Sequence, residues 1–208
     1  MSATDTTPTT LAGALWPARG NTILRNVVLV AAGVALMTLS AKVQVPIPPV
    51  PVTLQTLALP LIAAALGSRL GYITMLAYLA LGFAGQPVFA NTPPQIAGPL
   101  YFLGGTGGFL VAYPLAAWIT GLVAERTAGR SPAKLFAGML VGDLVIFAFG
   151  FAWLAFFVQI ADGAVGRGIA FAWDKAVLPF LWPDLVKLAL AAALITAGSS
   201  LAARLRRA

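Results

Sequence analysis

The sequence contains no cysteine and no histidine in its 208 residues. It therefore cannot form a disulfide, and it lacks the usual ligands of zinc and haem and the usual thiol and Ser–His nucleophiles. Charged residues make up only 9% of the chain, with six acidic residues against 13 Lys and Arg, whereas a soluble domain carries about 25%. These shortages argue against most hydrolases and metalloenzymes, so we expect neither catalysis nor a bound metal.

Hydrophobic residues are correspondingly abundant, at 60% of the chain with a mean hydropathy of +0.91. A transmembrane helix needs about 20 apolar residues, and six apolar stretches reach or approach that length. We therefore predict an all-α integral membrane protein, with a flexible cytoplasmic tail over residues 1–20 and a single membrane domain over residues 21–208. Its predicted spans are 23–41, 54–67, 70–83, 106–124, 135–159 and 184–203.

The basic residues predict the orientation of these spans. An even number of spans puts both termini on one side, where nine basic residues gather against three on the other side. Because cytoplasmic loops are enriched in Lys and Arg, we expect both termini inside. These residues lie at membrane edges and do not form one patch, so we expect contact with anionic lipid and no nucleic-acid partner. The inner set is Arg19, Arg25, Arg69, Arg126, Arg130, Lys134, Arg204, Arg206 and Arg207; the outer set is Lys42, Arg167 and Lys175.

Three unusual segments fall on the outer face in this topology. Residues 42–53 carry four prolines within six positions, which excludes a helix and favours an extended apolar flap, either a lid or a plain connector. Residues 83–103 form a long uncharged connection. A glycine-rich turn, residues 104–108, then opens the fourth span; it lacks the Lys-Ser/Thr ending of a phosphate loop, so we expect no nucleotide there.

Asp184 and Lys187 stand at the outer end of the last span. Residues three apart share a helix face, and charged groups at membrane depth normally face a cavity or the protein interior. They therefore indicate the polar end of a ligand pocket, or alternatively a simple ion pair at a helix start. The other candidate polar groups of this pocket are Gln55, Asn91, Tyr101, Thr106 and the glycine turn. We expect Asp143 in the fifth span to lie far from Asp184, near the cytoplasmic end, where it reaches water; the alternative is a proton relay.

Three motifs in order carry a resemblance to a known family. Residues 51–57, Pro-Val-Thr-Leu-Gln-Thr-Leu, follow the proline flap and look like the signature of the BioY family, the biotin-specific S components of energy-coupling-factor (ECF) transporters. Residues 104–110 resemble that family's Gly-Pro-Thr-Gly-Gly-Tyr-Leu motif, and residues 181–187 resemble its Pro-Gly-Asp-Leu-x-Lys motif. Gly104 replaces the family's proline, and Trp182-Pro183 replaces Pro-Gly, so the pocket's shape is matched less closely than its polar residues.

The resemblance implies a six-helix S-component-like bundle in a bacterial cytoplasmic (inner) membrane that captures biotin from outside. It implies that Asn91 and Asp184 hold the ureido ring, Lys187 binds the carboxylate, and Phe89 and Tyr101 cover the rings. The remaining expected ligand-binding residues are Gln55, Thr106 and Gly107.

The resemblance also implies partners. Ala31 and Ala35 would contact a transmembrane T component, and two cytoplasmic ATPase subunits would hydrolyse the ATP, so this chain would bind no cofactor itself. The alternative is a solitary vitamin carrier that works without an ATPase module. Six spans are few for such a carrier, and no internal repeat is visible in the sequence.

Overall fold

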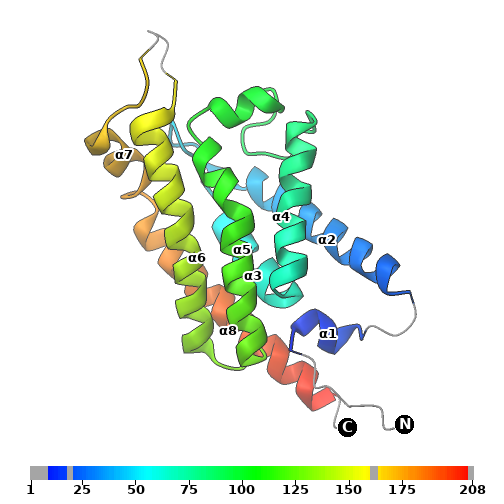
Figure 1. Cartoon of the computed structure of the whole chain (residues 1–208). Helices are drawn as coiled ribbons and strands as arrows, with labels where there is room; N and C mark the ends of the chain where they lie inside the picture. Colours follow the sequence, from blue (N-terminus) through cyan, green and yellow to red (C-terminus); the bar gives the residue numbers. More distant parts are fainter. Residues whose placement is uncertain (1–8, 18–20, 160–163, 206–208) are drawn as a thin grey trace.

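The computed structural model describes residues 9–17, 21–159 and 164–205, and it is mostly helical (Figure 1). A two-stranded hairpin connects α2 to α3, a 3₁₀ turn (η1) precedes α5, and a π-helical turn (η2) continues α6. In chain order the elements are α1 Leu11–Leu15, α2 Thr22–Lys42, β1 Gln44–Val45, β2 Val52–Thr53, α3 Gln55–Leu66, α4 Ser68–Phe83, η1 Pro99–Leu103, α5 Gly107–Thr127, α6 Pro132–Ala152, η2 Trp153–Phe157, α7 Ile169–Ala176 and α8 Leu181–Leu205.

Each of the six predicted spans is a helix, but they differ in length. Four are long and apolar enough to cross a membrane: α2, α5, α8, and α6 together with its η2 extension. The other two, α3 and α4, have 12 and 16 residues, or about 18 and 24 Å at the rise of an α-helix, against about 30 Å of bilayer hydrocarbon. The chain is thus a multi-pass membrane protein in which two of the predicted spans form short helices.

A single glycine lets α3 and α4 follow one another directly. Gly67 has a φ of 89°, a backbone conformation that residues other than glycine rarely adopt. A Cβ there would lie 2.4 Å from Oε1 of Glu125. That same carboxylate accepts hydrogen bonds from the backbone N–H and the hydroxyl of Ser68, at 2.8 and 3.1 Å, so α5 caps the start of α4.

The expected flexible tail contains a helix, and for residues 11–15 that expectation was wrong. Thr10 caps α1 by accepting a hydrogen bond from the N–H of Gly13 at 3.1 Å, and Ala12 is buried. Tertiary contacts stabilise this short helix, because its apolar side packs against α8 and α3. Residues 1–8 and 18–20 of the predicted tail lie outside the described residues.

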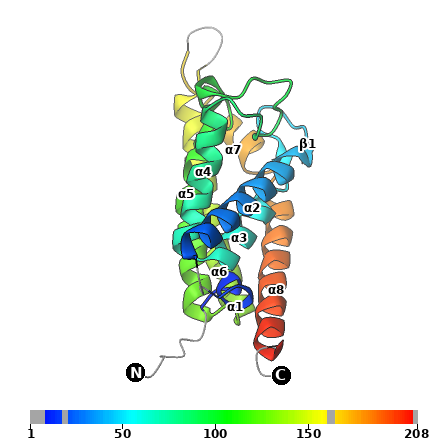
Figure 2. The ribbon, with the colours of Figure 1, turned by 90° about the vertical axis from the view of Figure 1, so that its right-hand side faces the viewer.

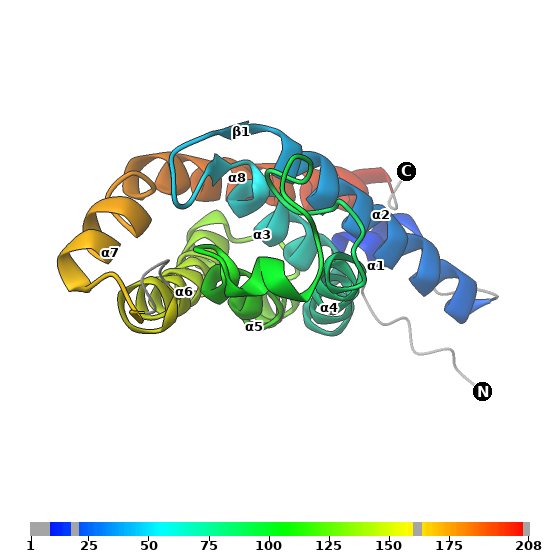
Figure 3. The same cartoon turned by 90° about the horizontal axis from the view of Figure 1, so that it is seen from above.

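The two ends of the bundle are built differently (Figures 1 and 2). The α1 end carries α1 and the C-terminal end of α8. The hairpin end carries β1–β2, η1 and α7, which lie over or beside the helix ends when the bundle is seen from above (Figure 3). The hairpin pairs Gln44 with Thr53 and Val45 with Val52, and its four prolines lie in the loop between the two strands. The segment is not helical, as predicted, but it turns back at residues 48–49 instead of following one extended path.

Glycines at the start of α5 allow two elements to approach closely. A Cβ on Gly105 would lie 3.1 Å from Cβ of Pro49 in the hairpin. A Cβ on Gly108 would lie 2.2 Å from Cβ of Trp153, where α6 passes into η2. The glycine turn therefore positions both the hairpin and α6 against α5.

Candidate ligand-binding site

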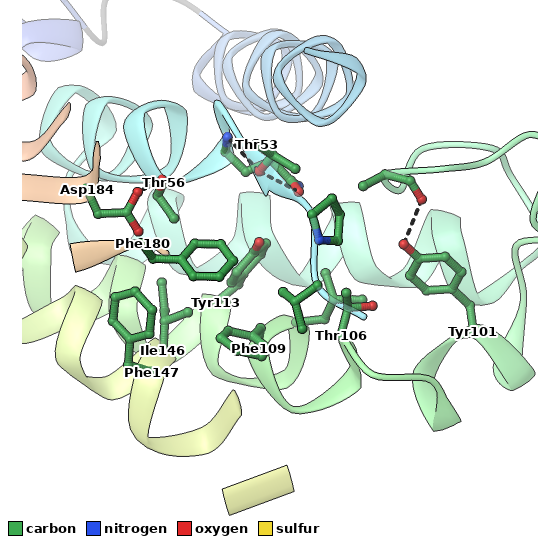
Figure 4. A pocket seen from close by; sticks show the side chains of 15 residues that line it. Thr53, Thr56, Tyr101, Thr106, Phe109, Tyr113, Ile146, Phe147, Phe180 and Asp184 are labelled. Carbon is green, nitrogen blue, oxygen red and sulfur yellow. Dashed lines mark hydrogen bonds between the residues drawn. The ribbon is translucent and has the colours of Figure 1, made fainter. Parts of the chain in front are cut away.

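A small cavity lies at the hairpin end, enclosed by the hairpin and by α3, α5, α6 and the start of α8 (Figure 4). Its volume is about 40 Å³, which holds only a few water molecules. The walls are mainly aromatic, and the ring of Phe180 lies 6.5 Å from that of Phe109 and 5.9 Å from that of Phe147. The residues lining the cavity are Val50, Pro51, Thr53, Gln55, Thr56, Ala90, Tyr101, Thr106, Phe109, Leu110, Tyr113, Ile146, Phe147, Phe180 and Asp184.

Asp184 forms one polar end of this cavity, as predicted from the sequence. Its side chain is 1% exposed, and Oδ1 accepts hydrogen bonds from the hydroxyl of Thr56 and the ammonium of Lys187, both at 2.8 Å. Oδ2 is buried and has no hydrogen-bond partner among the described residues. Because a buried acceptor without a donor is costly, this oxygen is suited to receive an N–H group from a ligand.

Lys187 lies behind Asp184 and is not one of the residues that line the cavity. Its ammonium donates to the carbonyl of Thr53 at 2.8 Å, to the hydroxyl of Thr56 at 2.9 Å and to Asp184 at 2.8 Å. An ammonium has three donors, and all three are used within the protein. The ion pair at the helix start therefore exists, and it also joins the hairpin, α3 and α8 at the cavity wall.

Gln55 lines the cavity and begins a hydrogen-bonded chain into the core. Its amide nitrogen donates to the hydroxyl of Tyr78 at 2.8 Å, and that hydroxyl donates to the carbonyl of Val88 at 3.0 Å. Tyr78 is fully buried on α4, and sequence reasoning missed it. The available signal was a tyrosine within an apolar helix, whose hydroxyl needs a partner once it is buried.

Tyr101 and Thr106 form the other end of the cavity, and Figure 4 shows Tyr101 far from Asp184. The hydroxyl of Tyr101 donates to the carbonyl of Ala90 at 2.7 Å. Burial raises the pKa of Tyr101, because a buried phenolate is poorly solvated, so this hydroxyl stays a neutral donor at physiological pH.

Asn91 lies in an adjoining cavity of about 290 Å³, on the far side of Tyr101 and Thr106, which border both cavities. Its side-chain oxygen accepts a hydrogen bond from the amide of Gln44 at 2.8 Å. The structure therefore does not bring Asn91 and Asp184 together around one small cavity.

Phe89 and Gly107 support the walls and do not line either cavity. Phe89 is fully buried, with its ring stacked at 4.8 Å on Tyr101 and edge-on at 5.3 Å to Tyr78. A Cβ on Gly107 would lie 1.8 Å from the carbonyl oxygen of Phe102. Both residues therefore act on the site through packing in this conformation.

The expectation for Asp143 was wrong. Its side chain is buried within the bundle and does not reach water at the cytoplasmic end. It lies one turn before Ile146, which lines the cavity. The reason is tertiary: α6 packs directly against α8, so one face of α6 has no access to solvent or lipid.

Ala31 and Ala35 are exposed on α2. They line an open groove of about 1280 Å³ between α2 and α4. Small residues on an exposed apolar helix let another helix approach closely, and their role as a partner contact stays a prediction. Within the described ranges, no group of three or more acidic side chains could hold a metal ion.

Comparison with known proteins agrees with the motifs. The family model described as the BioY family matches residues 8–204. The probable biotin transporter BioY of Pyrococcus horikoshii is 41% identical over 167 residues, covering 80% of this chain and 91% of that protein. The biotin transporter BioY of Thermotoga maritima is 36% identical over 166 residues, covering 79% and 90%.

A solved structure shares the fold. The S-component for biotin from an ECF-type ABC transporter superposes with a TM-score of 0.72 at 21% identity, covering 91% of this chain and 95% of that one. These relatives are named as transporters, in agreement with the prediction that the chain is not an enzyme. Together with the family match over nearly the whole length, they show that this chain is a member of the BioY family.

Proposed function

We propose that this protein captures biotin at the outer face of the membrane and delivers it as the S component of an ECF-type transporter. The names of its relatives support biotin as the ligand. The observation in this chain that carries the proposal is the buried, unpartnered Oδ2 of Asp184 at the end of an aromatic cavity. A cyclic urea such as that of biotin offers N–H donors, and a carboxylate oxygen accepts them strongly.

The arrangement of the cavity suggests how the ligand lies. The ureido ring would bind at Asp184 and Gln55, and the apolar rings would lie between the aromatic walls. The carboxylated tail would point toward Tyr101 and Thr106 and the adjoining cavity that holds Asn91. Lys187, expected to bind the carboxylate, would instead fix Asp184, because its three donors are already used.

Binding requires the site to open. A cavity of about 40 Å³ is too small for a bicyclic ligand with a five-carbon tail. The hairpin is the element suited to move, since it covers the cavity with Val50 and Pro51 and is joined to the bundle through Thr53 and Gly105. This supports the lid interpretation of the proline segment over a plain connector.

The proposed topology has six crossings, two of them made by the short helices α3 and α4, with both termini in the cytoplasm. The α1 end, which holds the N-terminal helix and the C-terminal end of α8, would face the cytoplasm of a bacterial inner membrane. A T component would dock along Ala31 and Ala35 on α2, and two ATPase subunits would supply the ATP hydrolysis. This chain would bind no cofactor.

Isothermal titration of the purified, detergent-solubilised protein with biotin tests the ligand. We expect one-site binding that is lost or strongly weakened in Asp184→Asn. An absence of binding by folded protein would refute biotin capture.

Uptake of labelled biotin into proteoliposomes, with and without the T component and the ATPases, then tests the partnership. Uptake that requires ATP and the partners would support the ECF assignment. Equal uptake by the chain alone would favour the solitary carrier.

A further inference from the structure

The segment Pro87–Thr92, between α4 and η1, forms part of the site without any regular secondary structure. Ala90 lines the cavity, Asn91 lines the adjoining one, and Phe89 stacks on Tyr101, which borders both. The position of this segment therefore decides the shape of the Tyr101 end of the site. A segment outside helices and strands must satisfy its carbonyl groups in other ways.

All six consecutive carbonyl groups of this segment accept hydrogen bonds, and most donors come from side chains. Tyr78 donates to the carbonyl of Val88 at 3.0 Å, and Tyr101 donates to that of Ala90 at 2.7 Å. The backbone N–H of Gln95 donates to Asn91 at 2.8 Å.

The other three carbonyl groups belong to Pro87, Phe89 and Thr92, and all three accept from the ammonium of Lys42. The distances to Pro87 and Phe89 are both 2.7 Å, and the bond to Thr92 is also short. The hydroxyl of Thr92 lies 3.2 Å from the same ammonium and itself donates to Phe89 at 2.7 Å. One side chain thus holds half of the segment's carbonyl groups.

We propose that Lys42 is a positioning residue of the ligand site, fixing the segment Pro87–Thr92 to the end of α2. Lys42 is the last residue of α2 and lines neither cavity, so it acts through Phe89, Ala90 and Tyr101. Both salt bridges within the described part of the chain are made by other lysines, Lys175 and Lys187. The ammonium of Lys42 is therefore directed to backbone carbonyl groups, and hydrogen bonds from a charged donor are stronger than neutral ones.

This inference takes its ligand, biotin, from the proposed function. It adds that the shape of the site depends on the position of α2. The hairpin follows α2 directly, and Lys42 attaches the other side of the site to the same helix end. A shift of α2 would therefore reach the site by two routes, one covalent and one through Lys42.

The test compares Lys42→Met with Lys175→Met, a control that removes an exposed lysine paired with Asp174 on α7. Hydrogen exchange of the ligand-free protein reports on peptides covering residues 86–98, and titration reports biotin affinity. We expect Lys42→Met to speed exchange in that segment but not in α5, and to weaken biotin binding about tenfold, a plausible loss for charge-assisted hydrogen bonds. Lys175→Met should change neither quantity.

Other outcomes overturn the inference. Unchanged exchange would show that Lys42 does not hold the segment, and faster exchange with unchanged affinity would show that the segment does not shape the site. If Lys42→Met does not fold, Thr92→Val, which removes one acceptor and the bond to Phe89, should give a smaller effect in the same direction. If wild-type protein does not bind biotin, the proposed function fails, and the exchange comparison alone still decides whether Lys42 holds the segment.

Discussion

The core at the hairpin end is rich in aromatic rings, whereas the core at the α1 end is made of small and aliphatic side chains. The first includes Tyr78, Phe89, Tyr101, Phe109 and Phe180. The second consists of Ala64, Ala124, Leu135, Met139, Leu188, Ala191, Ala192 and Ile195. Aromatic rings that stack on one another line the cavity at the hairpin end, whereas small side chains at the α1 end let helices approach closely.

The two ends of the bundle differ in role: one forms the candidate ligand site and the other holds the helices together. The hairpin end holds the polar networks of Asp184, Lys187 and Lys42, together with the cavity that the hairpin covers. The α1 end keeps α3, α5, α6 and α8 in fixed relation. Substitutions at the hairpin end should therefore change affinity, and those at the α1 end should change stability. Four variants test this division, from the largest expected effect to the smallest.

Asp184→Asn should have the largest effect, weakening biotin about 100-fold or more. The carboxylate is buried and paired, and losing one member of such a pair costs about 2–5 kcal/mol. Titration calorimetry measures it, with Asp174→Asn on the exposed ion pair of α7 as the control. An affinity within threefold of wild type would show that Asp184 does not contact the ligand.

Lys187→Met should weaken biotin about 30-fold, because Asp184 then loses its charged partner while remaining buried. If Lys187 acts through Asp184, biotin and biotin amide, which lacks the carboxylate, should weaken by the same factor. Titration of both ligands against both proteins measures this. A loss confined to biotin itself would show direct contact between Lys187 and the ligand's carboxylate.

Phe180→Leu should weaken biotin about tenfold by removing part of an aromatic wall. Phe180 is buried beside Phe109 and Phe147, so the change alters the cavity without touching its polar ends. Phe157→Leu at an exposed position is the matched control. Equal affinities for the two variants would show that the ring of Phe180 does not contact the ligand.

Ala191→Leu should leave affinity within about twofold of wild type but lower the melting temperature. Ala191 is fully buried at the α1 end, and overpacking a core costs about 1–3 kcal/mol. Ala193→Leu, on the exposed face of the same helix, is the control and should not change the melting temperature. Thermal unfolding followed by tryptophan fluorescence measures both variants. A large loss of affinity in folded Ala191→Leu would show that the two ends are not independent.

Much of the site could be predicted from the sequence because its strongest signals are local. Asp184 and Lys187 stand out as charges in an apolar run, and their spacing alone places them on one face. The prolines of residues 42–53 prevent a helix whatever surrounds them, so a non-helical connection was also predictable, whereas its folding into a hairpin was not. Tyr78 and Lys42 were missed as site residues because their partners, Gln55 and the carbonyl groups of residues 87–92, lie far from them in sequence.

The sequence by itself determined the membrane class, the positions of the six helices, the lack of a helix in the proline segment and the family motifs, because each depends on composition or on neighbours a few residues apart. Only the tertiary structure decided that Asp143 is buried, that α1 packs on α8, and that Lys187 faces Thr53 and Asp184 instead of the cavity. It also decided that Asn91 and Asp184 border different cavities. Whether a side chain is buried, and which acceptor a donor group faces, depend on which helices pack together. In this chain such contacts join residues up to 134 positions apart.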